Sequence, residues 1–231
     1  MSSPGFTRAS AVIFDAYGTL LDINSAMAAH APRIGPDWPR ISLEWRAKQL
    51  EYAWVRSITG PAHHEDFWLC TRDALDVVLM RNGLHDAGLK QDLLESYRIL
   101  SAYPEVPPML RSLRAAGIPA AILSNGSPWM LESAVAAAGI GELLDAVLSV
   151  EEVGVFKPDP RVYKLATRQF GASADRMIFV SSNPWDAQAA AHAGFQVVRI
   201  NRDGAPDEYG LAALLLAELP DLSFLPELAG V

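Results

Sequence analysis

The stretch AVIFDAYGTLLD, residues 11–22, begins with four apolar residues and then breaks at Asp15 into a turn that contains Gly18 and Thr19. Three further apolar runs also stop at polar residues: AAIL before Ser124, MIFV before Ser181 and VVRI before Asn201. Short apolar runs of this kind suit strands that are buried on both faces of a parallel sheet. We therefore predict that Asp15 lies at the carboxyl end of a buried strand.

Helical patterns with clear ends separate these runs. SPWMLESAVAAAG has an N-cap residue, a proline at the first helical position and a terminal glycine, namely Ser127, Pro128 and Gly139. DPRVYKLATRQFG repeats this order with Asp159, Pro160 and Gly171. Strands that alternate with helices indicate right-handed βαβ units, so the predicted fold class is α/β, with a doubly wound, Rossmann-like parallel sheet as its core. Ligands of such sheets bind beyond the carboxyl ends of the strands.

Residues 22–102 contain no convincing buried strand, and we predict that they form a helical cap subdomain inserted into a core of residues 1–21 and 103–231. The best helix in this segment is SLEWRAKQLEYAWVRSI, whose apolar residues recur at the spacing of one helical face: Leu43, Ala47, Leu50, Trp54 and Ile58. The tail LAALLLAELPDLSFLPEL, residues 211–228, is expected to form one more helix and an end broken by proline.

Composition excludes several classes of protein. The net charge of −8 over 231 residues argues against a nucleic-acid partner, because affinity for the phosphate backbone comes mainly from basic residues. No apolar run reaches the roughly 18 residues of a membrane span. The single cysteine, Cys70, fits a reducing compartment, and the first ten residues lack the apolar region of a signal peptide. The default expectation is a cytoplasmic protein.

Three groups of polar residues could carry chemistry at the strand ends. Asp15 is well placed to be a nucleophile, although a turn or helix cap also uses aspartate. The stretch Ser124-Asn125-Gly126 offers donors before a helix N-terminus, where an anion is favoured, but the same residues are common in turns. Lys157, in GVFKPDP, is informative only in combination, since most lysines lie on the surface.

In combination, the motifs DAYGTLLD, SNGS, KPDPRVY and SSNPWDAQAAAHAG resemble the haloacid dehalogenase superfamily and, more narrowly, its L-2-haloacid, or (S)-2-haloacid, dehalogenases. WRAKQLEYAW is similar to the cap motif of that family, and the resemblance extends from Ala11 to about Arg202. Phosphatases of the superfamily carry a second aspartate where this chain has Tyr17, and an acidic pair for Mg²⁺ where SSNPWD leaves only Asp186. The expected enzyme therefore uses neither a metal ion nor another cofactor.

The resemblance implies a mechanism and a role for each catalytic residue. Asp15 would displace halide with inversion and form an ester, and water activated by Asp186 would then attack the carboxyl carbon of Asp15. Ser181 and Asn183 would orient the water and Asp186, and Lys157 would keep Asp15 ionised. Thr19 would hydrogen-bond around Asp15, and Tyr163 would hold Lys157 or line the site.

The resemblance also implies the substrate contacts. Ser124 and backbone amides would hold the substrate carboxylate, and Arg46, Asn125 and Trp185 would bind the departing halide, with Tyr17 and Leu50 lining the pocket. A guanidinium, an amide N–H and an aromatic edge suit a large polarisable anion. From the residues alone, Arg46 could equally be a cation at the border of the apolar stripe and Trp185 a core aromatic. The expected partners are the 2-haloacid, the halide and a second copy of the chain in a homodimer.

Two departures from the family pattern and three alternative functions stay open. Ala47 stands where several relatives carry glutamine, and ITGPAHHEDFW, residues 58–68, differs from some relatives; its adjacent His63 and His64 lack a third ligand for a metal. The alternatives are a related hydrolase that acts on fluoroacetate or a cyclic amino acid, a Mg²⁺-dependent phosphatase, and a non-catalytic protein that binds a small anion.

Overall fold

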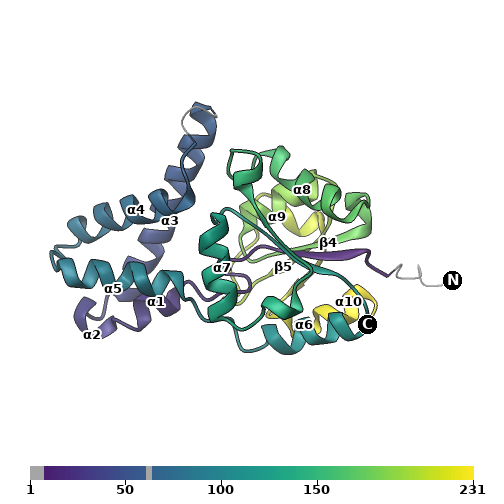
Figure 1. Ribbon diagram of the computed structural model, residues 1–231, viewed down its shortest axis with the longest axis horizontal. Coiled ribbons are helices and arrows are strands. Elements are labelled where there is room, and N and C mark those ends of the chain that lie inside the picture. Colours follow the sequence, from purple (N-terminus) through teal and green to yellow (C-terminus); the bar gives the residue numbers. More distant parts are fainter. Residues whose placement is uncertain (1–7, 61–63) are drawn as a thin grey trace.

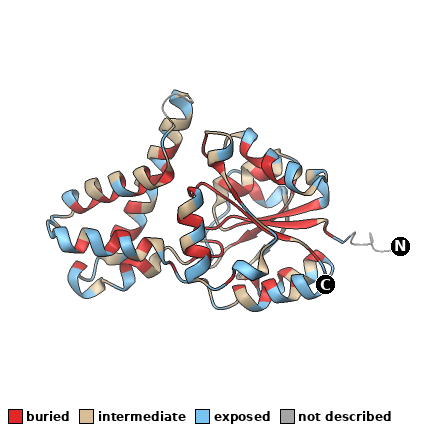
Figure 2. Cartoon of the chain, in the orientation of Figure 1, coloured by how far each residue is buried: buried red, intermediate tan, exposed pale blue. Residues whose placement is uncertain are grey.

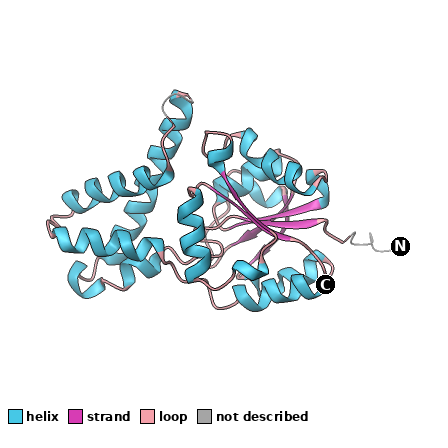
Figure 3. Ribbon diagram, in the orientation of Figure 1, coloured by secondary structure: helices cyan, strands magenta, loops and turns pink. Residues whose placement is uncertain are grey.

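The computed structural model describes residues 8–60 and 64–231, and its centre is a six-stranded, all-parallel sheet (Figures 1 and 3). The strand order is β3-β2-β1-β4-β5-β6. The strands are β1 Ala11–Phe14, β2 Ala120–Ser124, β3 Ala146–Ser149, β4 Met177–Ser181, β5 Gln196–Ile200 and β6 Leu215–Leu219. The predicted α/β fold class is confirmed.

Helices cover both faces of the sheet and form a separate group beside it (Figure 1). The core helices are α6 Val106–Ala115, α7 Pro128–Ala137, α8 Pro160–Phe170, α9 Pro184–His192 and α10 Leu225–Ala229. The group beside the sheet is α1 Asn24–Ala28, α2 Ala31–Ile34, α3 Trp38–Thr59, α4 Phe67–Arg81 and α5 Ala87–Arg98. Short 3₁₀ turns occur at Gly141–Leu143, Val150–Glu152, Ala174–Arg176, Leu211–Ala213 and Leu222–Phe224.

The central strands are buried along their whole length (Figure 2). β1 pairs with β2 on one side and with β4 on the other: the chain runs outward from β1 to β2 and β3, and then crosses back from β3 to β4 on the far side of β1. Such a point in an open α/β sheet opens a crevice at the carboxyl ends of the strands. Asp15, Ser124 and Ser181 therefore meet at this edge, as predicted from the three apolar runs.

Two linkers join the core to helices α1–α5, which we call the cap. Leu21 forms an antiparallel bridge with Ala102, the amide of Asp22 donates to the carbonyl of Ser101, and the amide of Tyr103 donates to the carbonyl of Leu20. The linkers thus lie side by side, next to the loop that follows Asp15. In the described part of residues 22–102 the cap contains helices and no strand of the sheet.

The N-terminal and C-terminal capping predicted for helices α7 and α8 is found in part. The Asp159 side chain accepts a hydrogen bond from the amide of Arg161, and Gly171 ends α8 in the left-handed conformation with φ 60°. Ser127 occupies the N-cap position of α7, but its hydroxyl makes no capping hydrogen bond. Pro128 and Pro160 begin their helices, as expected for a residue that has no N–H to satisfy.

The helix expected at the start of the tail is wrong, and two strands, β3 and β6, were not predicted. Residues Leu215–Leu219 form β6, because this run pairs in parallel with β5 along the edge of the sheet. Leucine and alanine favour helices in isolation, but strand pairing overrides that preference here. β3 lies at the opposite edge, where a four-residue strand that is only partly buried gives little apolar signal.

The expected apolar face of α3 is also wrong. Leu43 and Ile58 are 65% and 84% exposed, whereas the buried face consists of Ile41, Ser42, Trp45, Gln49, Leu50 and Ala53. Two of these residues are polar and are buried because they have hydrogen-bond partners: Ser42 donates to Asn24 over 2.8 Å, and Gln49 binds Thr71 and Tyr97. A pattern that counts only apolar residues misses such a face.

Candidate active site

Asp15 lies directly after β1 and is 4% exposed. Its Oδ2 accepts hydrogen bonds from Thr19 Oγ1 at 3.2 Å and from Asn183 Nδ2 at 2.9 Å, while its Oδ1 accepts one from Lys157 Nζ at 3.1 Å. An ionised carboxylate has about four lone-pair directions. These three donors hold the group firmly and leave one lone pair on Oδ1, which is what a nucleophile requires.

The hydroxyl of Thr19 is oriented by a residue that the sequence interpretation did not single out. Thr19 Oγ1 accepts from the amide of Ser182 at 2.9 Å and lies 3.2 Å from Ser182 Oγ. Because the single hydroxyl hydrogen of Thr19 goes to Asp15, Ser182 must be the donor between the two hydroxyls. Gly18 has φ +88°, and a Cβ there would lie 3.3 Å from Ser182 Oγ, so glycine lets the turn pack against this hydroxyl.

Lys157 is fully buried between two carboxylates. Its Nζ donates to Asp15 Oδ1 at 3.1 Å and to Asp186 Oδ2 at 2.9 Å, and it lies 5.1 Å from the ring centroid of Phe179. Burial alone would lower the pKa of Lys157, but attraction by Asp15 and Asp186 outweighs it, so the pKa is raised. The side chain is therefore a permanent cation at neutral pH.

Asp186 is fully buried in the first turn of α9. Its Oδ1 accepts from the Tyr163 hydroxyl at 2.6 Å, and its Oδ2 accepts from Ser181 Oγ at 3.0 Å as well as from Lys157. Burial raises the pKa of Asp186; attraction by Lys157 opposes this, and repulsion from Asp15 adds to it. A carboxylate with a raised pKa is a better acceptor for the proton of a water molecule.

Tyr163 completes the group as a donor. Burial, followed by the charge of Asp186, raises the pKa of Tyr163 well above its ordinary value, so the phenol stays protonated and donates to Asp186. One continuous hydrogen-bonded network thus joins all seven side chains predicted to be catalytic: Asp15, Thr19, Lys157, Tyr163, Ser181, Asn183 and Asp186.

Two predicted anion-binding residues lie after β2. Asn125 Oδ1 accepts from the backbone amide of Lys157 at 2.8 Å, so the NH₂ group of Asn125 points elsewhere and is available as a donor. The buried Ser124 hydroxyl accepts from the amide of Gly126 at 3.1 Å, which leaves its own hydrogen for another acceptor. Both side chains can therefore donate to an anion.

Tyr17 and Leu50 are both buried. The ring of Tyr17 stacks on that of Tyr97 with centroids 5.6 Å apart and packs closely against Gly126, where a Cβ would come within 3.0 Å of its hydroxyl. Leu50 is not part of the hydrophobic cluster to which Ile41 and Trp45 of the same helix belong. Their role in lining a substrate pocket stays a prediction.

Two predicted halide ligands, Trp185 of the core and Arg46 of the cap, each contact a residue of α3. Trp185 is half-buried at the start of α9 and meets Trp54 of α3 edge to face, with ring centroids 5.5 Å apart. These two rings line a cleft of about 780 Å³ between cap and core. Arg46, also half-buried, donates from Nη1 to Gln49 Oε1 at 2.7 Å, and sequence reasoning missed this partner one helical turn away.

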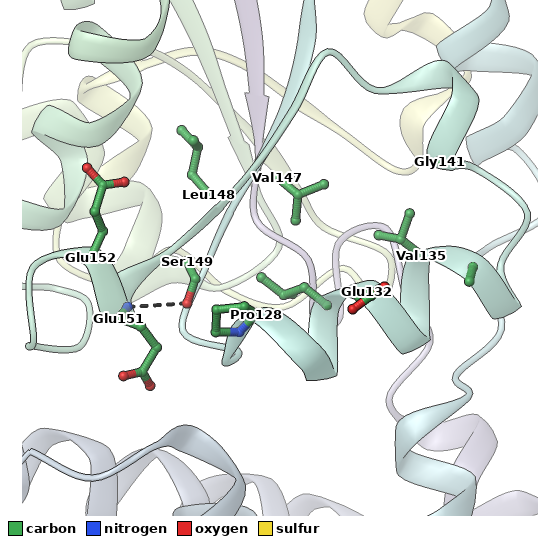
Figure 4. A pocket seen from close by; sticks show the side chains of 11 residues that line it. Pro128, Glu132, Val135, Gly141, Val147, Leu148, Ser149, Glu151 and Glu152 are labelled. Carbon is green, nitrogen blue, oxygen red and sulfur yellow. Dashed lines mark hydrogen bonds between the residues drawn. The ribbon is translucent and has the colours of Figure 1, made fainter.

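A second groove, of about 790 Å³, lies away from the network, between α7 and the edge strand β3 (Figure 4). Apolar side chains such as Val135 and Leu148 line it together with three carboxylates, those of Glu132, Glu151 and Glu152. Glutamates would repel a small anion, so this groove is a poor site for an anionic substrate.

Within residues 8–60 and 64–231, no group of three or more His, Cys, Asp or Glu side chains is arranged to hold a metal ion. His64 Nε2 lies 3.1 Å from Glu151 Oε2, and its ring lies 4.6 Å from that of Phe156, whereas His63 is outside the described residues. Ala47, the departure beside Arg46, is exposed.

Among the described helices none is both long and apolar enough to cross a membrane.

Comparison with known proteins gives consistent matches. A family model described as haloacid dehalogenase-like hydrolase matches residues 9–194. (S)-2-haloacid dehalogenase 1 of Pseudomonas sp. (strain CBS-3) is 46% identical over 219 residues, which cover 94% of this chain and 95% of that protein.

Solved structures agree with the sequence matches. A dehalogenase crystallised with an intermediate complex has a TM-score of 0.92 at 42% identity, covering 97% of this chain and 99% of that one. The L-2-haloacid dehalogenase of Xanthobacter autotrophicus, solved with chloropropionic acid covalently bound, has a TM-score of 0.82 at 35% identity, covering 95% of this chain and 98% of that one.

Proposed function

This chain belongs to the haloacid dehalogenase-like hydrolases and, among them, to the (S)-2-haloacid dehalogenases, and we propose that it hydrolyses short L-2-haloalkanoic acids to D-2-hydroxy acids through an ester on Asp15, without a metal ion. The observation that carries this proposal is the position of Lys157 Nζ, 3.1 Å from Asp15 and 2.9 Å from Asp186. The chain itself supplies the cation between the two carboxylates.

The first step is displacement of halide. The free lone pair of Asp15 Oδ1 attacks the carbon that bears the halogen from the side opposite the halogen, a C–O bond forms, and the halide leaves with the electron pair of the broken bond. The configuration inverts. Thr19 and Asn183 hold Oδ2, and Lys157 donates to Oδ1 before the attack.

The second step is hydrolysis of the ester. A water oxygen adds to the carboxyl carbon of Asp15 while Asp186 accepts the proton; the bond between that carbon and the ester oxygen then breaks, and the 2-hydroxy acid leaves with a proton returned by Asp186. The raised pKa of Asp186 suits this role. Because Asn183 Nδ2 is bound to Asp15, its carbonyl oxygen is available to accept from the same water.

Substrate binding uses donors around this pair. Ser124 has a free hydroxyl hydrogen for the substrate carboxylate, and we assign the departing halide to the free NH₂ of Asn125 together with Arg46 and Trp185. Halide needs no proton to leave. The absence of a second carboxylate at Tyr17 therefore does not impair the reaction, whereas the alkoxide leaving group of a phosphate ester does require a general acid.

The charge of Lys157 supports the proposed metal independence. A divalent cation between Asp15 and Asp186 would have to displace or approach the buried ammonium of Lys157, whose pKa is raised and which stays charged. Hard cations of this kind also need six or more oxygen ligands. Lys157 thus takes the place that a Mg²⁺ ion would need.

We also propose that the protein is a cytoplasmic homodimer with no nucleic-acid partner. The net charge of −8 argues against binding to the phosphate backbone. The exposed apolar residues Leu43 and Ile58 on α3 favour contact with a second copy. Light scattering coupled to size exclusion is expected to give the mass of two chains; the mass of one chain would contradict the dimer.

Enantiomer-resolved halide release tests the function. With EDTA present, the protein should release chloride from L-2-chloropropionate and yield D-lactate, and it should leave the D enantiomer intact. Phosphate release from p-nitrophenyl phosphate with Mg²⁺, and no chloride release, would support the phosphatase alternative. Inactivity in both assays would favour a fluoroacetate or cyclic amino acid hydrolase, or an anion-binding protein.

A further inference from the structure

Gln49 of α3 is a polar side chain that is 1% exposed, and it is bound on both sides of its amide. On one side its Oε1 accepts from Arg46 Nη1 at 2.7 Å. On the other its Nε2 donates to Thr71 Oγ1 at 2.6 Å. We propose that Gln49 is a positioning residue that fixes the guanidinium of Arg46 for anion binding; this inference rests on the proposed function, which gives the halide to Arg46.

The orientation of the Gln49 amide is determined by its partners. The Thr71 hydroxyl donates its only hydrogen to the carbonyl of Phe67 over 2.8 Å, so toward Gln49 it can only accept. It must therefore face the NH₂ of Gln49, and the amide oxygen must face Arg46. A flipped amide would place N–H groups against the guanidinium and leave the Thr71 oxygen facing another oxygen.

This arrangement engages one nitrogen of Arg46 and leaves others for a ligand. A guanidinium has five N–H donors in a rigid planar fork, so a bond at Nη1 sets the direction of the rest. Arg46 Nε is buried and has no hydrogen-bond partner within the described residues. Gln49 therefore acts as the fixed acceptor on one side of the fork, and an incoming anion can take the other.

The amide is anchored by three helices of the cap. Gln49 lies on α3, Thr71 on α4 and Tyr97 on α5, and Gln49 Nε2 lies 3.1 Å from the Tyr97 hydroxyl. Trp45 of α3 reinforces the junction, since its Nε1 donates to the carbonyl of Thr71 at 2.8 Å. The position of Arg46 is thereby tied to the cap as a whole and not to one flexible side chain.

The same junction contacts the loop that carries the nucleophile. Tyr97 stacks on Tyr17 with an interplanar angle of 14°, and Tyr17 is two residues from Asp15. Arg46, Gln49, Tyr97 and Tyr17 form a continuous path from the cap cation to the loop after β1. Fixing Arg46 relative to this loop is the geometric requirement for stabilising a halide as it leaves.

A double-mutant cycle separates positioning from a purely structural role. Gln49→Met keeps the length of the side chain and removes its polar atoms, and we expect it to lower kcat/KM by about 10- to 100-fold, the scale on which small displacements act. In the Arg46→Ala background the same change should cost less than about threefold, because the group that Gln49 positions is gone. Equal losses in both backgrounds would overturn the proposal.

The matched control is Ser42→Ala. Ser42 is also buried on α3, one turn before Arg46, but its hydroxyl binds Asn24 and not Arg46. We expect kcat/KM within about twofold of the wild type for this variant. The loss of a hydrogen bond that does not involve Arg46 should lower the stability of the protein and leave the guanidinium in place. If Gln49→Met does not fold, Thr71→Val replaces it, because valine cannot accept from the Gln49 amide.

Calorimetric titration with bromide gives a readout that does not depend on turnover. Gln49→Met should weaken bromide binding by about tenfold or more, and Ser42→Ala should leave it unchanged. If the wild type binds bromide in this way but hydrolyses no haloacid, the proposed function fails and the role of Gln49 stands. If Gln49→Met binds bromide as tightly as the wild type, or if the wild type binds none, the role of Gln49 is refuted.

Discussion

Replacing Lys157 by methionine removes the positive charge that lies between two buried carboxylates, and it should be the most damaging single substitution to both stability and turnover. At 3.1 and 2.9 Å, and with an effective dielectric constant of about 20, each ion pair contributes roughly 5 kcal/mol of attraction before desolvation is subtracted. Removal of one partner of a buried pair typically lowers the free energy of unfolding by about 3–5 kcal/mol. We expect that loss for Lys157→Met at pH 7.

The pH dependence of this loss has a definite sign. The pKa of Lys157 is raised from 10.5, so its stabilising contribution is complete below 10.5 and disappears as the pH rises through the raised value. The pKa of Asp186 is raised from 3.8 by burial, and loss of the lysine raises it further. The variant should therefore regain stability as the pH falls toward 3.8, because the carboxylates take up protons.

Urea unfolding of the wild type and Lys157→Met at pH 7 and pH 5 measures this directly. The difference in the free energy of unfolding should be smaller at pH 5. A second variant, Lys157→Met with Asp186→Asn, should recover part of the lost stability but none of the activity, because one of the two unpaired charges is gone. Equal stability of Lys157→Met and wild type at both pH values would refute the electrostatic argument.

Two further substitutions and one labelling experiment test other parts of the structure. Tyr163→Phe removes a hydrogen bond that lowers the pKa of Asp186, so the acid limb of the kcat–pH profile should move to higher pH; an unmoved limb would exclude Asp186 as the base. Gly126→Ala places a Cβ 3.0 Å from Tyr17 and Leu131 and should cost about 1–3 kcal/mol of stability in thermal unfolding, whereas an unchanged melting temperature would mean that the loop can shift freely. Burial raises the pKa of the Cys70 thiol to about 12, so iodoacetamide at pH 8 should label the urea-unfolded chain and not the native one; rapid native labelling would contradict this burial.

The catalytic group was predictable because the sheet brings the ends of its strands together. Asp15, Ser124 and Ser181 each come at the end of an apolar run that becomes a central strand, so the expectation of a parallel sheet was enough to place them at one edge. The edge strands were less accessible. β3 is only partly buried, and β6 is a leucine-rich run whose conformation depends on pairing with β5.

The cap was harder to predict because its packing depends on polar contacts. Ser42 and Gln49 are buried because they hydrogen-bond to residues elsewhere in the cap, so the apolar pattern of α3 indicated the wrong face. The partner of Arg46 was within reach of sequence reasoning, since Gln49 lies three residues further on the same helix. The stacking of Tyr97 on Tyr17 depends on tertiary structure and has no sequence signal.

The most direct test of the central proposal is a single turnover of excess enzyme with L-2-chloropropionate in ¹⁸O-labelled water, followed by mass spectrometry of the peptide that contains Asp15. Water that attacks the carboxyl carbon of Asp15 leaves its oxygen on the enzyme. We therefore expect ¹⁸O in Asp15 and unlabelled D-lactate after one turnover. Label in the lactate and none in Asp15 would mean that water attacks the substrate directly, and it would contradict the ester mechanism.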